Sequence, residues 1–160
     1  MVVLRCTQKL LKRLGPPVEV IEPSTNALGD WFATPVSVGH QRFILLISER
    51  SILPVLMPGR DVKHLAKNFP GSLAHVLLEL EVPPSAIMRE VEASRDAVIA
   101  KTNNRSLLGT LSDFSNMLWY HMQRHDEVDL VEMALRLAHS PVQPLRPSHF
   151  PDQVTRMLLQ

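Results

Sequence analysis

A dense polar segment, residues 101–106, stands between a short apolar run and a stretch with helical spacing. Residues 97–100 are apolar and β-branched at their centre, while Leu107, Leu108, Leu111, Phe114 and Leu118 recur at helical spacing. A strand-to-helix corner of this kind points backbone N–H groups and short polar side chains outward, so it can bind an anion or a polar partner. The alternative is an ordinary N-cap and turn, for which Asn and Ser are the preferred residues.

Two histidines have a spacing found in some metal sites. His121 and His125 lie four residues apart on a predicted helix, with Asp126 and Asp129 just beyond. This spacing places both imidazoles on one helix face. The arrangement lacks the glutamate of a His-Glu-x-x-His motif, and no further ligand is specified. We interpret it as a solvated helix end and expect no metal and no cofactor.

The sequence contains no catalytic motif. Asp30, Glu49 and Lys101 could converge at strand ends, as acidic residues and lysines do in metal-dependent nucleases, but no spacing rule brings them together. A Gly-x-Ser-x-Gly elbow is absent, and the six glycines are too dispersed for a phosphate-binding loop. Cys6 falls in or at the end of a predicted strand, so we interpret it as a buried thiol rather than a nucleophile.

The net charge of the chain is close to zero, so any attraction for an anionic partner must come from a local basic patch. Seventeen Lys and Arg against sixteen Asp and Glu give a net charge of +1, which provides no global attraction for nucleic acid or anionic membrane. Arg5, Lys9, Lys12 and Arg13 form a basic group that could join Lys101 and Arg105 in one positive surface. Nucleic acid is therefore a possible partner, although no aromatic residues are interleaved for base stacking.

The strand pattern predicts an α+β fold. Three β-type runs, 31–38, 42–48 and 52–57, have the spacing of an antiparallel meander. The middle run is apolar on both faces over 43–47, so we expect it to be the central strand, covered on each side. We predict a mostly antiparallel sheet of four or five strands packed against several helices, with strands at about 2–5, 31–37, 42–48, 52–57 and 97–101.

Helical spacing predicts the elements that pack on this sheet. The predicted helices are 8–14 after an N-cap at Thr7, 62–69 ended by Pro70, about 72–81, one beginning at Pro83 and Pro84, 106–124 as the most buried, 126–138, and a last short one over 154–159. We expect residues 1–160 to form a single domain with a proline-rich C-terminal segment from about residue 140.

Cysteine content and the N-terminal segment bear on the compartment. A single cysteine, Cys6, excludes an internal disulfide and fits a reducing environment. Basic residues interrupt the apolar residues of segment 1–14, which therefore lacks the apolar stretch of a signal peptide. No window approaches a membrane span, so no membrane partner is expected. These features predict a cytoplasmic protein of a microbe.

Several short motifs in a fixed order resemble a known family. They are Leu-Arg-Cys-Thr at 4–7 with Lys-Leu-Leu-Lys-Arg-Leu at 9–14, Leu-Gly-Asp-Trp at 28–31, Glu-Arg at 49–50 before Leu-Pro-Val at 53–55, and Ala-Lys-Thr-Asn-Asn-Arg-Ser-Leu-Leu-Gly at 100–109 with Asp-Phe at 113–114. Together they resemble an uncharacterised bacterial domain family, one of the numbered domains of unknown function. The resemblance implies a bacterial or phage-like source and a compact domain, and it implies no activity.

The motif residues suggest three interpretations. The first is a non-enzymatic binding or interaction module, with a protein partner or a second copy as further possible partners, whose polar surface gathers Arg5, Asp30, Glu49, Arg50, Lys101, Asn104, Arg105 and Asp113. The alternative is a metal-dependent hydrolase acting on nucleic acid, which requires convergence of Asp30, Glu49 and Asp113 in one cleft. The third is that these residues pair with one another. Arg105 precedes the expected helix start, where a cation is poorly placed, so we expect one of the three carboxylates to hold it.

Overall fold

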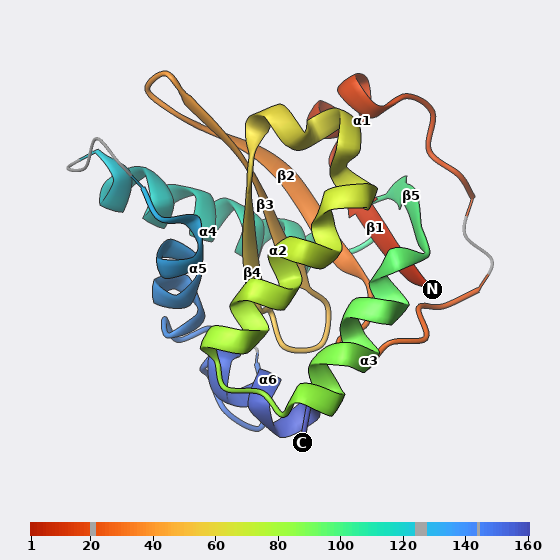
Figure 1. Cartoon of the computed structure of the whole chain (residues 1–160). Coiled ribbons are helices and arrows are strands. Elements are labelled where there is room, and N and C mark those ends of the chain that lie inside the picture. The colour runs from red at the N-terminus through yellow and green to blue at the C-terminus, as the bar shows by residue number, and fades with distance from the viewer. Residues whose placement is uncertain (20–21, 124–127, 144) are drawn as a thin grey trace.

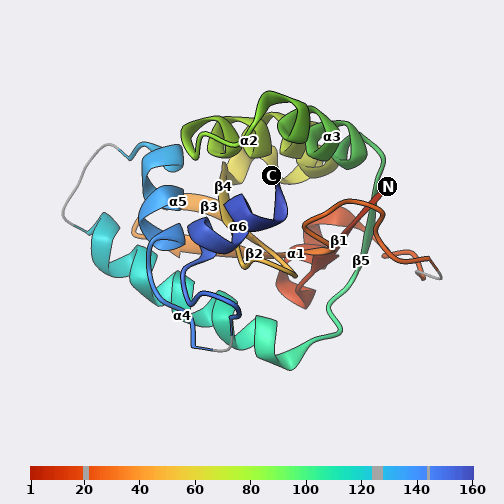
Figure 2. The same cartoon turned by 90° about the horizontal axis from the view of Figure 1, so that it is seen from below.

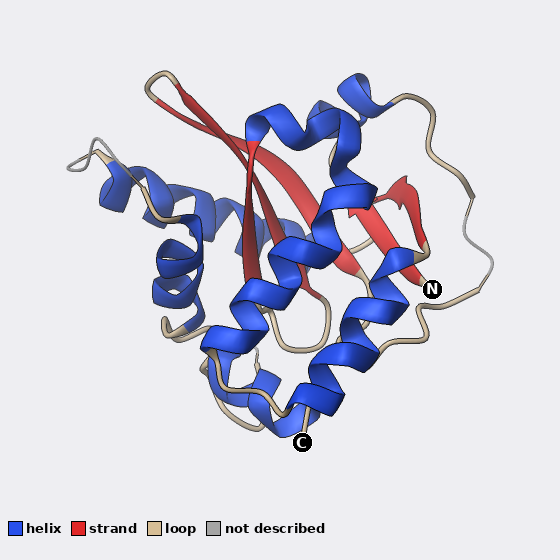
Figure 3. Cartoon of the chain, in the orientation of Figure 1, coloured by secondary structure: helices blue, strands red, loops and turns tan. Residues whose placement is uncertain are grey.

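A five-stranded mixed sheet forms the centre of the fold (Figures 1 and 3). The computed structural model describes residues 1–19, 22–123, 128–143 and 145–160. The strand order is β4-β3-β2-β1-β5, and the strands are β1 (Val2–Cys6), β2 (Trp31–Val38), β3 (Gln41–Ser48), β4 (Pro54–Pro58) and β5 (Ala97–Lys101). The predicted α+β class is confirmed.

The predicted meander is present as the antiparallel half of the sheet. β2 and β3 pair along their whole length, from Trp31 opposite Ser48 to Val38 opposite Gln41. β4 then pairs antiparallel with β3. Residues 43–48 of β3 are buried, as expected of a strand covered on both faces. The central position nevertheless belongs to β2, because β1 and β5 extend the sheet on the other side of β2.

The other half of the sheet is parallel, which the sequence patterns did not indicate. β1 lies between β2 and β5 and is parallel to both. The connection from β1 to β2 contains the helix α1 (Gln8–Leu14) and a long loop. A crossover of that length returns the chain to the same end of the sheet, which is what a parallel pair requires.

Helices cover both faces of the sheet (Figure 2). α2 (Leu65–Glu79) and α3 (Pro84–Arg95) lie on one face, and α4 (Arg105–Met122) crosses the other. The edge strand β4 is packed by α5 (Leu130–Ala138), which shields that edge of the sheet. A 3-10 helix, η1 (Gly59–His64), leads into α2, and α6 (Pro151–Leu158) confirms the expected helix near the C-terminus.

Two helix predictions were wrong, namely the helix break at Pro70 and the rank of α4 as the most buried helix. The sequence predicted a break at Pro70, but α2 continues through it, and Pro70 is buried beside Phe69. An interior proline costs about 3 kcal/mol, and burial of the stripe containing Leu65, Phe69 and Leu73 offsets that cost. α2 buries six of its 15 residues and α4 six of its 18, so α4 is not the most buried helix.

Side chains cap the starts of α4 and α5, whereas Thr7, the predicted N-cap of α1, makes no side-chain capping hydrogen bond. Asn104 caps α4, because its Oδ1 accepts a hydrogen bond from the Leu107 N–H at 3.1 Å. Asp129 caps α5 in the same way, through the N–H groups of Val131 and Glu132. The expected boundaries at residues 124 and 126 lie outside the described residues. Within the described part of the chain, no helix combines the length and the apolar character needed to cross a membrane.

Replacing Leu111 or Phe114 by Ala should destabilise the protein. Each residue is only 2% exposed, on the face of α4 that packs against the sheet. Loss of contacts and the remaining cavity should lower the free energy of unfolding by about 2 to 5 kcal/mol in urea unfolding experiments. Ser112→Ala, at an exposed position of the same helix, is the control. Changes under about 0.5 kcal/mol for both core variants would contradict this packing.

Candidate functional site

An ion pair between β1 and the start of β2 organises the predicted polar residues. Arg5 Nε donates to Asp30 Oδ2 at 2.7 Å, and the two side chains are 16% and 12% exposed. Arg5 Nη1 also donates to the carbonyl oxygen of Lys101 at 3.0 Å. The Ser24 hydroxyl donates to Asp30 Oδ1 at 2.5 Å and accepts from the N–H of Val3. Both Asp30 oxygens are therefore engaged by the protein itself.

The turn after β3 lies against this ion pair. Glu49 Oε2 accepts from the Asp30 N–H at 3.1 Å, and Arg50 Nη1 donates to the Ala27 carbonyl oxygen. Gly29 has φ +80°, and a Cβ there would lie 2.6 Å from Glu49 Oε2, so only glycine allows this approach. Arg5, Asp30, Glu49 and Arg50 line one cleft of about 250 Å³.

Lys101 borders a second cleft on the other side of Arg5. This cleft has a volume of about 470 Å³, and Val18 and Glu19 form its other wall. The N–H of Val18 donates to the Ile99 carbonyl oxygen at 2.9 Å, which fixes that segment along the outer edge of β5. Arg5 contributes to both clefts, so five of the eight predicted polar residues, Arg5 itself included, line these two clefts.

The other three predicted residues lie on α4. Asn104 is the N-cap, and Arg105 and Asp113 are exposed and line none of these clefts. The expected carboxylate partner of Arg105 was wrong: Arg105 forms no ion pair or hydrogen bond with any described residue. Asp30, one of the three carboxylates predicted to hold it, is bound by Arg5 instead.

The carboxylates do not form the constellation that a metal-dependent hydrolase requires. Asp30 and Glu49 line the same cleft, but Asp113 does not. Among the described residues, no group of three or more His, Cys, Asp or Glu side chains is placed to hold a metal ion. His121 is exposed near the end of α4, whereas His125 and Asp126 lie outside the described residues.

A basic cleft lies at the other end of β2, near the hairpin that joins it to β3. Lys9 and Arg13 from α1 and Arg42 from β3 line a cleft of about 380 Å³, together with residues 35–37 of β2. Gly59 closes one side, and a Cβ at this position would lie 2.7 Å from the Arg42 carbonyl oxygen, so glycine lets η1 approach β3. None of the three cations is paired with a described residue, and no carboxylate lines the cleft.

A family comparison places the chain among relatives of unassigned activity. Residues 3–153 match the model of the family described as Domain of unknown function (DUF6933). The chain belongs to this family. No curated protein matches the chain, and no solved structure matches it. DUF6933 membership agrees with the motif resemblance and assigns no role to any residue, so function must be argued from the geometry of the site.

The sequence interpretation grouped the basic residues differently from the structure. The sequence allowed one positive surface joining Lys9 and Arg13 with Arg5, Lys101 and Arg105. Lys9 and Arg13 instead line the basic cleft with Arg42, while Arg5 pairs with Asp30. Arg42 was not among the predicted residues. One sequence feature could have indicated Arg42: it is a charged residue at the start of an otherwise apolar strand.

Replacing Arg5 should destabilise the fold even when the positive charge is kept. Arg5→Ala leaves the partly buried Asp30 without its cation and should lower the free energy of unfolding by about 1 to 3 kcal/mol. Arg5→Lys should lose much of the same stability, because an ammonium group cannot reach Asp30 and the Lys101 carbonyl oxygen in the same geometry. Arg105→Ala should melt like the wild type. If all three variants melted at the wild-type temperature, Arg5 would have no structural role.

The Cys6 thiol should be unreactive in the native protein. Burial raises its pKa to about 12 from 9.0, because the thiolate would lose its hydration. Labelling by a thiol reagent at pH 8 should therefore be slow in buffer and fast in denaturant. Since the folded pKa is raised, ionisation leaves stability unchanged below pH 9 and reduces it as the pH rises toward 12. Fast native labelling would contradict the buried position.

Proposed function

We propose that this protein is a non-enzymatic binding module that holds the phosphate backbone of nucleic acid in the basic cleft. The supporting observation is the convergence of Lys9, Arg13 and Arg42 on one cleft that no carboxylate lines. Lys9 and Arg13 are four residues apart on α1, so their charges repel on the same helix face by about 0.2 to 0.5 kcal/mol. An anion bound between them would relieve this repulsion.

The surrounding surface supports a polymeric anion rather than a single small one. Lys12, Arg60, Lys63 and Lys67 are exposed on α1, η1 and the first turns of α2. These elements pack together at one end of the molecule (Figure 1), and Asp61 is the only acidic residue on α1, η1 and the first turns of α2. Cations spread beyond the cleft can neutralise several phosphates of one strand.

The chemistry of the cleft favours binding to phosphates over the reading of bases. Its aromatic residue, Phe43, is buried, so it offers no exposed ring for base stacking. Lysines and arginines without aromatic neighbours bind mainly by releasing counterions, which gives affinity without sequence preference. We therefore expect binding that depends strongly on salt and weakly on sequence.

The alternative of a metal-dependent hydrolase has less support. Its two converging carboxylates are already used, since Asp30 binds Arg5 and Ser24 while Glu49 binds the Asp30 N–H. The proposal places the module in a bacterial cytoplasm. The lone buried cysteine and the resemblance to bacterial motifs support that compartment.

Fluorescence anisotropy with short labelled DNA and RNA strands tests the proposed function. The wild type should bind with a Kd of about 1 to 100 µM at moderate salt, with log affinity falling linearly with log salt. The variant Lys9→Gln, Arg13→Gln, Arg42→Gln should bind about tenfold more weakly or worse, and its salt slope should be smaller by roughly 2 to 3.

The matched control is Arg89→Gln, Arg95→Gln, Arg105→Gln. It removes the same number of positive charges at exposed positions of α3 and α4, away from the basic cleft. The control should keep nearly wild-type affinity. Equal weakening in both triple variants would show that only net charge matters, and absence of binding at low salt would reject the proposal outright.

A further inference from the structure

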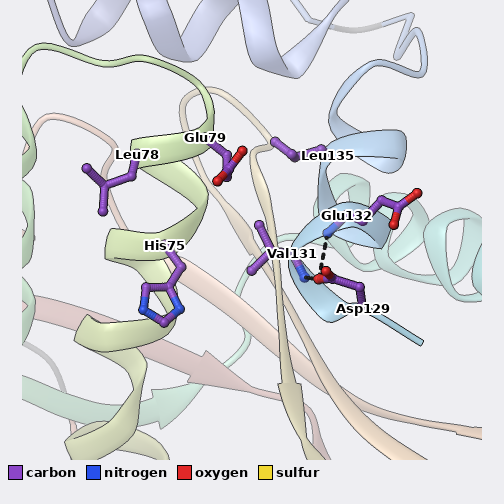
Figure 4. A pocket seen from close by; sticks show the side chains of 7 residues that line it. All are labelled: His75, Leu78, Glu79, Asp129, Val131, Glu132 and Leu135. Atoms are coloured by element: carbon purple, nitrogen blue, oxygen red, sulfur yellow. Dashed lines mark hydrogen bonds between the residues drawn. The ribbon is translucent and has the colours of Figure 1, made fainter. Parts of the chain in front are cut away.

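A second concave surface lies between α2 and α5, opposite in charge to the basic cleft. Figure 4 shows the residues of both helices that line this space, with Glu79 on the side of α2 that is toward α5 and Leu78 on its other side; the volume is about 420 Å³. Its apolar part comes from Leu78 on α2 and from Val131 and Leu135 on α5. We call this surface the α2–α5 groove.

Apolar side chains are exposed in this groove, and none of the residues that the structure describes covers them fully. Leu78 is 59% exposed, and Val131 and Leu135 are only partly buried. A single exposed leucine on a protein surface needs no explanation. Here, however, the leucine borders a concavity whose opposite wall is also apolar, which is the geometry that receives side chains of another molecule.

The rim of the groove is acidic. Glu79, Asp129 and Glu132 surround the apolar part, and the negative end of the α2 dipole is offset there by the positive end of α5, which Asp129 caps. Of these carboxylates, Glu132 lies 3.6 Å from Arg136 in an exposed pair that contributes little, and Asp129 caps α5. Glu79 forms no ion pair with any described residue. The groove therefore favours a cationic occupant.

We propose that the α2–α5 groove docks a basic amphipathic helix of a partner protein. Such a helix places leucine-like side chains at i, i+3 or i+4, and i+7 into the apolar part. Lysines or arginines flanking that stripe then meet Glu79 on one side and Glu132 on the other. Both walls are themselves helical, so a third helix can pack its ridges against them as in helix bundles.

Two other occupants fit less well. A small molecule needs a site that buries most of its surface, whereas His75, Leu78, Glu79, Asp129 and Glu132 are all exposed around this groove. A second copy of the chain would have to offer its own basic helix α1. That helix has seven residues, and its Leu10 is wholly buried in the core, so the apolar side chain at its centre is not available.

A titration of the isotope-labelled full chain with a designed peptide tests the proposal. The probe is a helical peptide with leucines along one face and lysines beside them, and its counterpart carries glutamate in place of each lysine. The lysine peptide should bind with a Kd of about 10 to 100 µM. Amide shifts should change at the end of α2 and along α5, while the glutamate peptide should leave them unchanged.

Exposed positions provide matched variants. Leu78→Ser, Glu79→Gln, Glu132→Gln should weaken binding of the lysine peptide about tenfold or more. The control Met88→Ser, Glu92→Gln, Asp96→Asn makes the same chemical changes on and after α3 and should bind like the wild type. Glu79→Lys, Glu132→Lys should exchange the preference and bind the glutamate peptide, which a merely unfolded variant cannot do.

Three results would overturn the docking proposal. The first is equal binding of both peptides to the wild type, and the second is a groove variant that binds as well as the control. The third is a wild-type chain that self-associates in light scattering while the groove variant stays monomeric, since the groove would then receive a second copy. Each result is independent of nucleic-acid binding, because the groove and the basic cleft share no residue.

Discussion

The contact between Arg5 and Asp30 ties together the two halves of the sheet. β1 lies between the antiparallel strands and β5, and its Arg5 binds the first turn into β2 through Asp30 and the end of β5 through the Lys101 carbonyl oxygen. A shift of β1 by one residue would turn Arg5 to the opposite face of the sheet and leave Asp30 unpaired. A partly buried ion pair adds little net stability, but a register that leaves Asp30 without its cation carries the cost of an uncompensated charge.

Sequence patterns were sufficient to predict the strands and helix starts that depend on neighbouring residues alone. The strand predicted at about 31–37 is observed as Trp31–Val38, and α1 begins directly after Thr7 as expected. Alternation, turn residues and capping residues act within a few positions, so a sequence displays them directly. Pro70 was misjudged because the burial of a whole stripe of α2, a tertiary effect, outweighs the local preference of proline to end a helix.

The side-chain pairs at the candidate site were less predictable, because the order of the strands in the sheet determines which residues meet. The sequence predicted that Arg105 would bind Asp30, Glu49 or Asp113. The arginine that binds one of these carboxylates is Arg5. Once β1 is placed beside β2, Arg5 is nearer to Asp30 and takes that position. In the same way, the net charge of +1 gives no indication of a basic cleft. Arg42 lies beside Lys9 and Arg13 because η1 approaches β3 at Gly59.

The two oppositely charged surfaces are held apart by α2. Lys67 lies near its start and Glu79 at its end, and twelve helical steps separate them by about 18 Å. At physiological ionic strength the screening length is about 8 Å, so charge at one surface has little effect on the other. The two proposed ligands, a nucleic-acid strand in the basic cleft and a basic helix in the α2–α5 groove, would therefore not compete for the same charges. α2 is packed against the sheet along its buried stripe, so the separation between the basic cleft and the α2–α5 groove is set by the length of one helix.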